Sequence, residues 1–403
     1  MNILYIGQIV PIEKIKKCTG YSVAGDIMQK NLLKELMCQS EIEDICMISV
    51  LPNAAFPRDR IWISNDQSKY CEGVVYNLSY CNIPGVKQYH QKKSIYKFAC
   101  AMAKKKKFDC IVCYNMYVQF GEVALKLAKK LDIPLVPILA DLPVENIKEN
   151  SSIFNRWQQL IIKKITFKNI QRVRHAIVLN ENAVCYMADK NDYLVISGGV
   201  EKEQTYLRKQ KFGIERKVIY AGALSTYSGI LNLISAIIQS DVQNIFLEIY
   251  GDGDLRNEII HISEKTPMIK YMGTRNINDM RSIMEKAWIL VNPRSVEDPV
   301  STISFPSKLF EYITCMRPVV TTEFMGMPES IKKIVFSCGK GTVEEIKETI
   351  KEISMTSEEI LDKKTEEAYR YVVDEMNWEK QAEKILVYLR TICTCKVKGD
   401  NKE

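Results

Sequence analysis

The sequence predicts an α/β protein with two doubly wound domains, and three observations support this. Short apolar runs alternate with amphipathic helical stretches along the whole chain. The runs are almost continuously apolar, which is typical of parallel strands that helices cover on both faces. The same alternation begins a second time after a charged, weakly periodic segment near residues 197–216. A chain of 403 residues is also long enough for two domains, each with its own core.

The first series of strand and helix patterns fills residues 1–200, which we expect to form an N-terminal Rossmann-like domain. It begins with NILYIGQIV and continues through AGDIMQKNLLKELM, DICMISVL, FDCIVCYN, GEVALKLAKKL and IPLVPILA. Two sheets of this type that face one another bind ligands in a cleft, at the carboxyl ends of their strands. The functional residues are therefore expected in the loops that follow strands.

The second series predicts a C-terminal Rossmann-like domain over residues 201–376. Its patterns are KVIYAGAL, NLISAIIQS, NIFLEIYGDGDL, IKYMGTRN, INDMRSIMEKA, WILVNPR and PVVTTE. A further helix over 377–392 is expected to pack back on the N-terminal domain, and residues 396–403 are expected to form a flexible tail.

The composition is that of a globular protein, with 46% hydrophobic and 26% charged residues and no low-complexity tract. No apolar run approaches the ~20 residues that span a bilayer. The sequence enters a strand pattern without a charged leader, so we expect a cytoplasmic protein. Its 13 cysteines sit mostly in apolar runs. Cys110 and Cys113 have CxxC spacing, but in a strand they point to opposite faces, so we expect reduced thiols and no metal site.

The formal net charge is +7, and residues 1–200 are the basic half, with 27 Lys and Arg against 18 Asp and Glu. Two basic stretches, 103–109 and 155–175, are compatible with an anionic membrane surface. The second interleaves apolar and basic residues as an interfacial helix does. A helix that faces the core and has a solvated basic side gives the same pattern. No base-reading module is present, so we expect no nucleic-acid partner.

The segment SFPSKLFEYITCMRPVV, residues 304–320, combines an apolar helix with two charged residues. Pro306 suits the first turn of a helix, and four apolar residues at helical spacing predict a stripe that packs on the sheet; they are Leu309, Tyr312, Ile313 and Met316. Lys308 and Glu311 share a face near the helix start. They suit a phosphate and a vicinal diol, respectively. A solvated salt bridge, worth about 0.3–0.5 kcal/mol, would give the same spacing.

This segment and its surroundings resemble the retaining glycosyltransferases of family four, which have the GT-B fold of two Rossmann-like domains across a cleft. The chain is most similar to the bacterial polysaccharide-type subset with the pattern NPR, a gap, then fPSKlfEYlasGkPVv. VIYAGAL, IYGDGDLRNEI, YMGTRN, GMPE and NWEKQAEKILVYL also lie where the family has such elements. The resemblance covers nearly the whole chain and is most specific over residues 218–329. It implies that residues 1–200 form an acceptor-binding domain and residues 201–376 a nucleotide-sugar-binding domain.

The resemblance implies a set of donor-binding residues, which are Gly25, Gly222, Arg275, Arg294, Ser307, Lys308 and Glu311. Glu311 corresponds to the glutamate that holds the ribose diol of a sugar nucleotide. Arg294 and Lys308 are placed near the diphosphate, where a planar fork and a compact charge both suit phosphate oxygens. Residues 273–275 would lie near the base. Asp141 and Lys308 are the catalytic candidates, with Asp141 near the reacting sugar. The acceptor-binding residues stay unknown.

Three positions depart from the family pattern. Ile303 stands where many relatives carry an acid that contacts the donor sugar. The turn ALSTYSGI lacks a cation that the family often has there. Met316 takes the place of a glycine that ends the helix. A left-handed conformation costs a non-glycine residue about 1–2 kcal/mol, so we expect the chain to leave this helix differently.

The function predicted from the sequence is transfer of a sugar from a UDP- or GDP-linked donor to a saccharide or polyprenyl-linked acceptor, in surface-polysaccharide assembly. The expected enzyme is a retaining, hexosyltransferase-type glycosyltransferase. No cofactor is expected, and the enzyme would lie at the inner face of the plasma membrane if it is peripheral. A GT-B sugar-nucleotide epimerase and a non-catalytic sugar-nucleotide binder are the alternatives.

Overall fold

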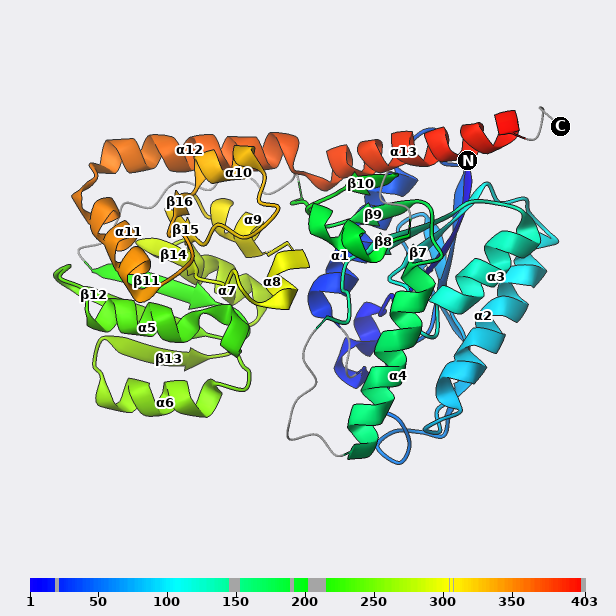
Figure 1. The fold of residues 1–403 in the computed structure, drawn as a ribbon, viewed down its shortest axis with the longest axis horizontal. Coiled ribbons are helices and arrows are strands. Elements are labelled where there is room, and N and C mark those ends of the chain that lie inside the picture. Colours follow the sequence, from blue (N-terminus) through cyan, green and yellow to red (C-terminus); the bar gives the residue numbers. More distant parts are fainter. Residues whose placement is uncertain are drawn as a thin grey trace. The chain divides into compact units, whose positions relative to one another are not determined.

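The computed structural model describes residues 1–18, 22–144, 153–188, 192–201, 215–303, 305–306 and 308–399 (Figure 1). The chain divides into two compact units. Unit 1 comprises Met1–Gly198 and Trp378–Glu403, and unit 2 comprises Gly199–Asn377.

Unit 1 is built on an eight-stranded sheet in the order β10-β9-β8-β7-β1-β2-β5-β4. Its strands are β1 (Asn2–Gly7), β2 (Asp44–Ser49), β4 (Asp66–Tyr70), β5 (Gly73–Asn77), β7 (Cys110–Tyr114), β8 (Leu135–Leu139), β9 (Ala176–Val178) and β10 (Tyr193–Val195). All neighbours are parallel except β4 and β5. The strand order reverses between β1 and β7, which makes that position the topological switch point of this sheet.

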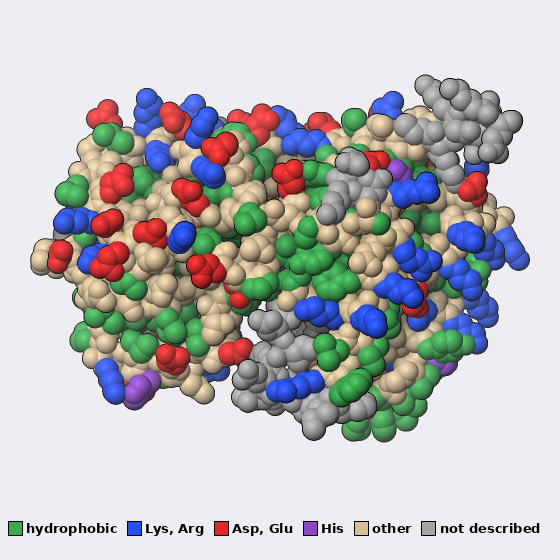
Figure 2. Space-filling model, in the orientation of Figure 1, with side chains coloured by type: hydrophobic (Ala, Val, Ile, Leu, Met, Phe, Trp, Pro, Cys, Tyr) green, Lys and Arg blue, Asp and Glu red, His purple; other side chains and the backbone are tan. Residues whose placement is uncertain are grey.

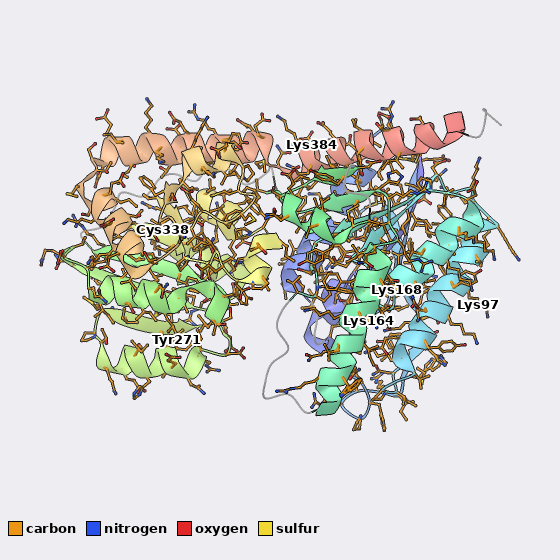
Figure 3. All side chains as sticks on the ribbon, in the orientation of Figure 1. Lys97, Lys164, Lys168, Tyr271, Cys338 and Lys384 are labelled. Atoms are coloured by element: carbon orange, nitrogen blue, oxygen red, sulfur yellow. The ribbon has the colours of Figure 1, made fainter. Side chains whose placement is uncertain are left out.

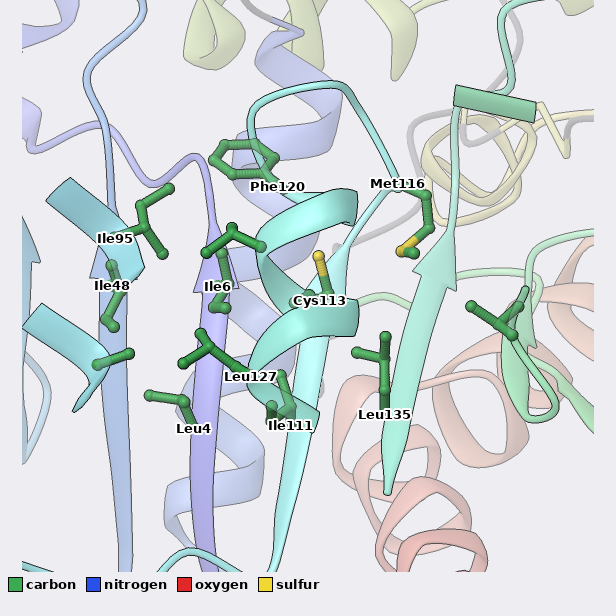
Figure 4. Close-up of a cluster of buried hydrophobic side chains, with 14 of the residues drawn as sticks. Leu4, Ile6, Ile48, Ile95, Ile111, Cys113, Met116, Phe120, Leu127 and Leu135 are labelled. Atoms are coloured by element: carbon green, nitrogen blue, oxygen red, sulfur yellow. The ribbon is translucent and has the colours of Figure 1, made fainter. Parts of the chain in front are cut away.

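Helices cover both faces of this sheet. One core lies between the sheet and α2 (Lys87–Ala103), α3 (Gly121–Leu131) and α4 (Ile153–Ile170), and Figure 4 shows part of it. The other core lies under α1 (Val23–Met37) and α13 (Trp378–Gly399). Cys113 belongs to the first core and Cys110 to the second, which confirms that these two thiols point to opposite faces.

Helix α13 packs against α1 within unit 1. It runs to Gly399 and so includes the first residues of the segment expected to be a tail. Residues 400–403 lie outside the described part of the chain.

Unit 2 has a six-stranded, all-parallel sheet in the order β13-β12-β11-β14-β15-β16. Its strands are β11 (Arg216–Ala221), β12 (Ile245–Tyr250), β13 (Ile269–Gly273), β14 (Ile289–Asn292), β15 (Val319–Thr321) and β16 (Phe336–Ser337). The order reverses between β11 and β14, as in a Rossmann fold. Together, the two parallel-type sheets confirm the predicted α/β class with two Rossmann-like domains.

The helices of unit 2 follow these strands in the chain, except that α9 comes directly after α8 and α12 directly after α11. They are α5 (Ile230–Ile238), α6 (Arg256–Lys265), α7 (Ile277–Met284), α8 (Pro299–Ile303), α9 (Lys308–Ile313), α10 (Glu329–Ile334), α11 (Val343–Met355) and α12 (Glu358–Glu375). Helices α5 and α11 pack together over one core, and α9 and α10 lie against α12.

Helix α9 is the motif helix of the sequence, and it is anchored as predicted. Leu309, Tyr312, Ile313 and Met316 are all buried, which confirms the apolar stripe. The Tyr312 hydroxyl donates to the Ala221 carbonyl at 3.0 Å and accepts from the Ala221 N–H at 2.8 Å. The register of β11 with β14 ends at Ile219, so the hydroxyl satisfies backbone groups that the neighbouring strand leaves unpaired.

The expected exit from α9 was wrong. Met316 adopts the left-handed conformation, with φ 53°, although it is not glycine. Its side chain is 9% exposed, and burial worth about 1.5–3 kcal/mol offsets the left-handed cost. Arg281 also holds the preceding turn, because its guanidinium donates to the Thr314 hydroxyl at 2.9 Å and to the Thr314 carbonyl at 2.8 Å.

We expect Tyr312→Phe to lower the free energy of unfolding by about 2 kcal/mol, because it leaves a buried N–H and a buried carbonyl of Ala221 without partners. Tyr271→Phe is the matched control, since that hydroxyl donates only to the Gly251 carbonyl, at 3.0 Å, and is half-buried. Urea unfolding followed by circular dichroism measures both. Equal losses in the two variants would contradict the special role of Tyr312.

Candidate functional site

The first part of the candidate site is the glycine-rich edge where β11 and β12 end. The Gly222 N–H donates to the Tyr250 carbonyl at 2.9 Å, so the chain is still in register there. Gly251 has φ 142°, and a Cβ atom at this position would lie 1.8 Å from the Gly222 carbonyl oxygen. No side chain fits that gap, so the two post-strand loops approach through bare backbone. The loops after β11 and β12 are therefore in direct backbone contact at this edge.

The second part is Arg294, in the loop after β14. Its Nε donates to the Ser301 hydroxyl at 2.8 Å, and its guanidinium lies 5.6 Å from the Tyr227 ring centroid. The Ser295 N–H donates to the Tyr227 carbonyl at 2.9 Å, so the loops after β11 and β14 are joined across the switch point. Burial lowers the pKa of Arg294, against smaller opposing effects of Tyr227 and Asp298. A desolvated guanidinium of this kind favours an anionic partner.

The third part is Lys308, the first residue of α9. Burial lowers the pKa of the Lys308 ammonium, and the Glu311 charge opposes that shift. Within the described residues, Lys308 and Glu311 form no ion pair at 4.0 Å or less, and no hydrogen bond satisfies either side-chain terminus. Glu311 is exposed. The described structure therefore does not contain the solvated salt bridge that the spacing also allowed.

The remaining predicted residues of unit 2 are placed differently. Arg275 is exposed after β13, two strands from the switch point, and donates to the Thr274 carbonyl at 3.0 Å. It lies near enough to Tyr250 for its charge to oppose, in part, the burial that raises that tyrosine's pKa. Ile303 is buried at the end of α8. Ser307 lies outside the described residues.

In unit 1, the structure brings Gly25 and Asp141 to the same tyrosine. A Cβ atom on Gly25 would lie 2.6 Å from the Tyr114 hydroxyl oxygen. Burial raises the pKa of Tyr114, and the Asp141 charge and a hydrogen bond with Asp141 raise it further. The Gly25 N–H itself donates to the Ser22 hydroxyl at 3.0 Å. Gly25 thus provides close approach at this edge while its own N–H is engaged.

Asn115 fixes the backbone that carries Asp141. Its Oδ1 accepts from the N–H groups of Ala140 and Asp141 at 2.9 and 3.0 Å, and its own φ is 56°. Tyr114 and Asn115 end the predicted strand run CIVCYN, so their position just at a strand end was a signal that sequence reasoning did not use. Tyr227 lies in the turn ALSTYSGI, which lacks a cation, and its ring packs beside the Arg294 guanidinium. The sequence pattern did not predict that contact.

The described residues contain no group of three or more His, Cys, Asp or Glu side chains placed to hold a metal ion. His175 Nδ1 instead lies 2.6 Å from an Asp192 oxygen, within unit 1. The chemistry offered by the described site is that of two desolvated cations, an exposed carboxylate and close backbone approach.

We expect Lys308→Met to raise the free energy of unfolding by about 1 kcal/mol at neutral pH, because a half-buried cation without a carboxylate partner penalises the folded state. Since the folded-state pKa of Lys308 lies below the unfolded value, this penalty is complete below the folded pKa and disappears as the pH rises through the unfolded pKa. The gain should therefore shrink at alkaline pH. Denaturant titrations at both pH values measure it.

Lys363→Met is the control for that experiment, because Lys363 is exposed in the same unit and should show no gain. A Lys308→Met protein that is less stable than the wild type would show that Lys308 is structural. Pyrophosphate binding, measured by calorimetry in the same variants, should weaken only for Lys308→Met.

Comparison with known proteins identifies a family model and solved structures that are similar to this chain. Residues 183–355 match the family model described as glycosyl transferases group 1. No curated protein matches the chain. Sucrose-phosphate synthase from Thermosynechococcus elongatus superposes with a TM-score of 0.68 at 15% identity, over 98% of this chain and 100% of that one. Anabaena HepE in complex with UDP gives 0.64 at 15% identity, over 97% and 100%.

The lipopolysaccharide outer core galactosyltransferase WaaB, in its apo form, gives a TM-score of 0.65 at 13% identity, over 96% of this chain and 99% of that chain. At these identities the likeness establishes the fold, and it confirms the predicted GT-B architecture. The matched family model lies within residues 183–355 and covers less than half of the chain.

Proposed function

We propose that the protein is a retaining glycosyltransferase that moves a sugar from a nucleotide-diphosphate donor to a saccharide or lipid-linked saccharide acceptor. The observation that carries this proposal is the placement of Arg294 and Lys308 after β14, at the carboxyl edge of the unit 2 sheet, where burial lowers the pKa of both. Two half-buried cations at a Rossmann switch point are suited to a diphosphate. Anabaena HepE, which shares the fold, has been solved with UDP and with UDP-glucose.

The proposed roles follow from the resemblance to the family. Arg294 and Lys308 hold the diphosphate, and Glu311 accepts hydrogen bonds from the ribose diol. Ser307 lies outside the described residues and belongs to the donor-binding set through the resemblance alone. Gly222 lets the donor approach the backbone, and Arg275 lies toward the base. In unit 1, Gly25 gives close approach and Asp141 lies near the reacting sugar.

The proposed reaction breaks the bond between the sugar C1 and the diphosphate oxygen and forms a bond from C1 to the acceptor oxygen on the same face. The departing diphosphate takes the acceptor proton, so no dedicated protein base is required. Arg294 and Lys308 stabilise the charge that develops on the leaving diphosphate oxygen. Groups of this kind act strongly because they are already oriented and partly desolvated.

We further propose the bacterial polysaccharide-type role for this enzyme, as a family-four transferase of capsule or exopolysaccharide assembly at the cytoplasmic membrane face. This part of the proposal is supported by two neighbouring motifs. The first, NPR, ends in Arg294, and the second, PSK followed by EY, includes Lys308, the first residue of α9. The described helices include none that is long and apolar enough to cross a membrane.

Donor turnover tests the proposal. Purified protein should release a nucleoside diphosphate from one of the UDP-, GDP- or ADP-sugars, and release should depend on an added saccharide acceptor. Proton NMR of the product should show the anomeric configuration of the donor. An inverted product would contradict the retaining mechanism. Tight nucleotide binding without turnover on a broad acceptor panel would favour the non-catalytic binder instead.

We expect Glu311→Ala to weaken nucleotide-sugar affinity by about 1–3 kcal/mol, because it removes charged hydrogen bonds to the ribose. Folding should be unaffected, since the Glu311 carboxylate is exposed. Calorimetry with the donor that the wild type binds best measures the change. Glu344→Ala, also exposed and in the same unit, is the control and should bind like the wild type. Unchanged affinity in Glu311→Ala would rule out the ribose role.

A further inference from the structure

Several large apolar side chains are exposed at one end of unit 1. The first group, here named the α4 tip, consists of Trp157, Leu160 and Ile161, which are 65%, 51% and 53% exposed. They lie near the start of α4 on one helical face, at i, i+3 and i+4. Farther along the same face come Lys164 and Lys168, which are also exposed. The helix thus changes from apolar to basic along its axis.

The second group, here named the loop cluster, lies before and at the start of α2, and each member is 38% to 60% exposed. Its members are Phe56, Ile61, Trp62, Ile83, Val86 and Tyr89. The buried Asn82 holds the loops together, because its carbonyl accepts from the Phe56 N–H at 3.0 Å and its N–H donates to the Ile61 carbonyl. Trp62 and Tyr89 both pack edge-on against His90. The cluster is therefore a built surface rather than a set of loose side chains.

Helix α2 repeats the order seen in α4. Its exposed face reads Tyr89, Lys93, Lys97, each four residues after the last. With a rise of about 1.5 Å per residue, these lysines lie about 6 and 12 Å behind Tyr89. Lys164 and Lys168 lie about 10 and 16 Å behind Trp157 on the same measure. Figure 3 shows Lys97 on α2 and Lys164 and Lys168 on α4.

The two groups share one edge of the molecule. Helices α2 and α4 each lead from a carboxyl strand end back to the next strand, so both begin at the carboxyl edge of the unit 1 sheet. Both contribute to the same core on one face, with α3 packed against each of them. Helix spacings of about 8–10 Å put the α4 tip about 20 Å from α2. Figure 2 shows hydrophobic side chains at this end of unit 1, with Lys and Arg along the same face.

The lysines behind the two apolar groups have no acidic partners in the described structure. Lys93 and Lys97 on α2, Lys164 and Lys168 on α4, and Lys129 on α3 are exposed and form no ion pair within 4.0 Å there. Lys126 and Lys130 of α3 lie over the Tyr96 ring. The carboxylate of Glu122, which also faces this layer, is engaged by Lys92. The layer therefore presents free positive charge.

We propose that this end of unit 1 docks on an anionic bilayer through two anchors, with the α4 tip and the loop cluster in the interfacial region and the lysines at the level of the lipid phosphates. Interfacial segments bury apolar side chains about 5–10 Å deep, which matches the step from apolar residues to lysines on both helices. Trp62, Tyr89 and Trp157 are of the aromatic types that gather at membrane interfaces. Each lysine near the surface adds about 1 kcal/mol of attraction, a factor of about 5.

Only the consequence of lipid docking for sugar transfer rests on the proposed function. The docked edge is the carboxyl edge of unit 1, which also carries Gly25 and Asp141. A lipid-linked acceptor would then meet the protein at the edge where its saccharide has to react. Lipid docking itself does not require that any sugar be transferred.

Vesicle flotation of the full chain tests the proposal. Phosphatidylcholine vesicles that contain phosphatidylglycerol should carry the protein, and pure phosphatidylcholine vesicles should not. Lys164→Gln with Lys168→Gln should weaken binding about 30-fold. The triple variant Trp157→Ser, Leu160→Ser and Ile161→Ser should weaken vesicle binding about tenfold or more. The double variant Trp62→Ser with Tyr89→Ser should weaken it by a similar factor, because the two anchors act together.

Matched controls use exposed residues away from this surface. Lys363→Gln with Lys384→Gln removes the same charge, and Met355→Ser with Val387→Ser removes exposed apolar side chains. Both controls should float like the wild type, and thermal unfolding should confirm that every variant folds. Nucleotide-sugar binding measured on the same preparations separates the two hypotheses, since a failed donor site leaves flotation intact.

Three outcomes would overturn the proposal. The first is absence of flotation at low salt. The second is dependence on the lysines but not on the apolar residues, which would indicate a soluble polyanion as the partner. The third is concentration-dependent dimerisation in analytical ultracentrifugation that the serine variants abolish without any effect of lipid, which would assign the surface to a second copy of the chain.

Discussion

The contact on which the unit 2 site depends is that of the Tyr312 hydroxyl with the backbone of Ala221. A Rossmann sheet has to part its strands at the switch point to make room for a ligand, and parting leaves strand-end N–H and carbonyl groups unpaired. One hydroxyl satisfies both groups here, at 2.8 and 3.0 Å. Because Tyr312 lies on α9, the same contact fixes the helix that begins at Lys308 and carries Glu311.

The rest of the edge follows from that opening. Gly251 lets the loop after β12 pass against Gly222, and Tyr227 supports the guanidinium of Arg294 from the opposite side of the switch point. Arg294 and Lys308 are half-buried at this edge, and burial lowers the pKa of both.

One edge of unit 1 carries two groups of residues. Tyr114 and Asn115 organise Gly25 and Asp141 where β7 and β8 end. The starts of α2 and α4 at the same edge carry exposed apolar residues with lysines behind them. Parallel topology explains this coincidence, since it sends every crossover helix back from the carboxyl ends of the strands. An acceptor with a lipid anchor and a saccharide end would fit such an arrangement.

The sequence alone determined the alternation of strands and helices, the buried stripe of α9 and the opposite orientation of Cys110 and Cys113, because these depend only on local periodicity. The tertiary structure decided the rest. Tyr312 meets Ala221 across 91 positions of the chain, Gly25 meets Tyr114 only after two strands pair, and Met316 adopts φ 53° because its side chain is buried by other elements. The apolar residues of α4 matched a core helix equally well in sequence; whether Trp157 is covered depends on what packs against it, and periodicity carries no information about that.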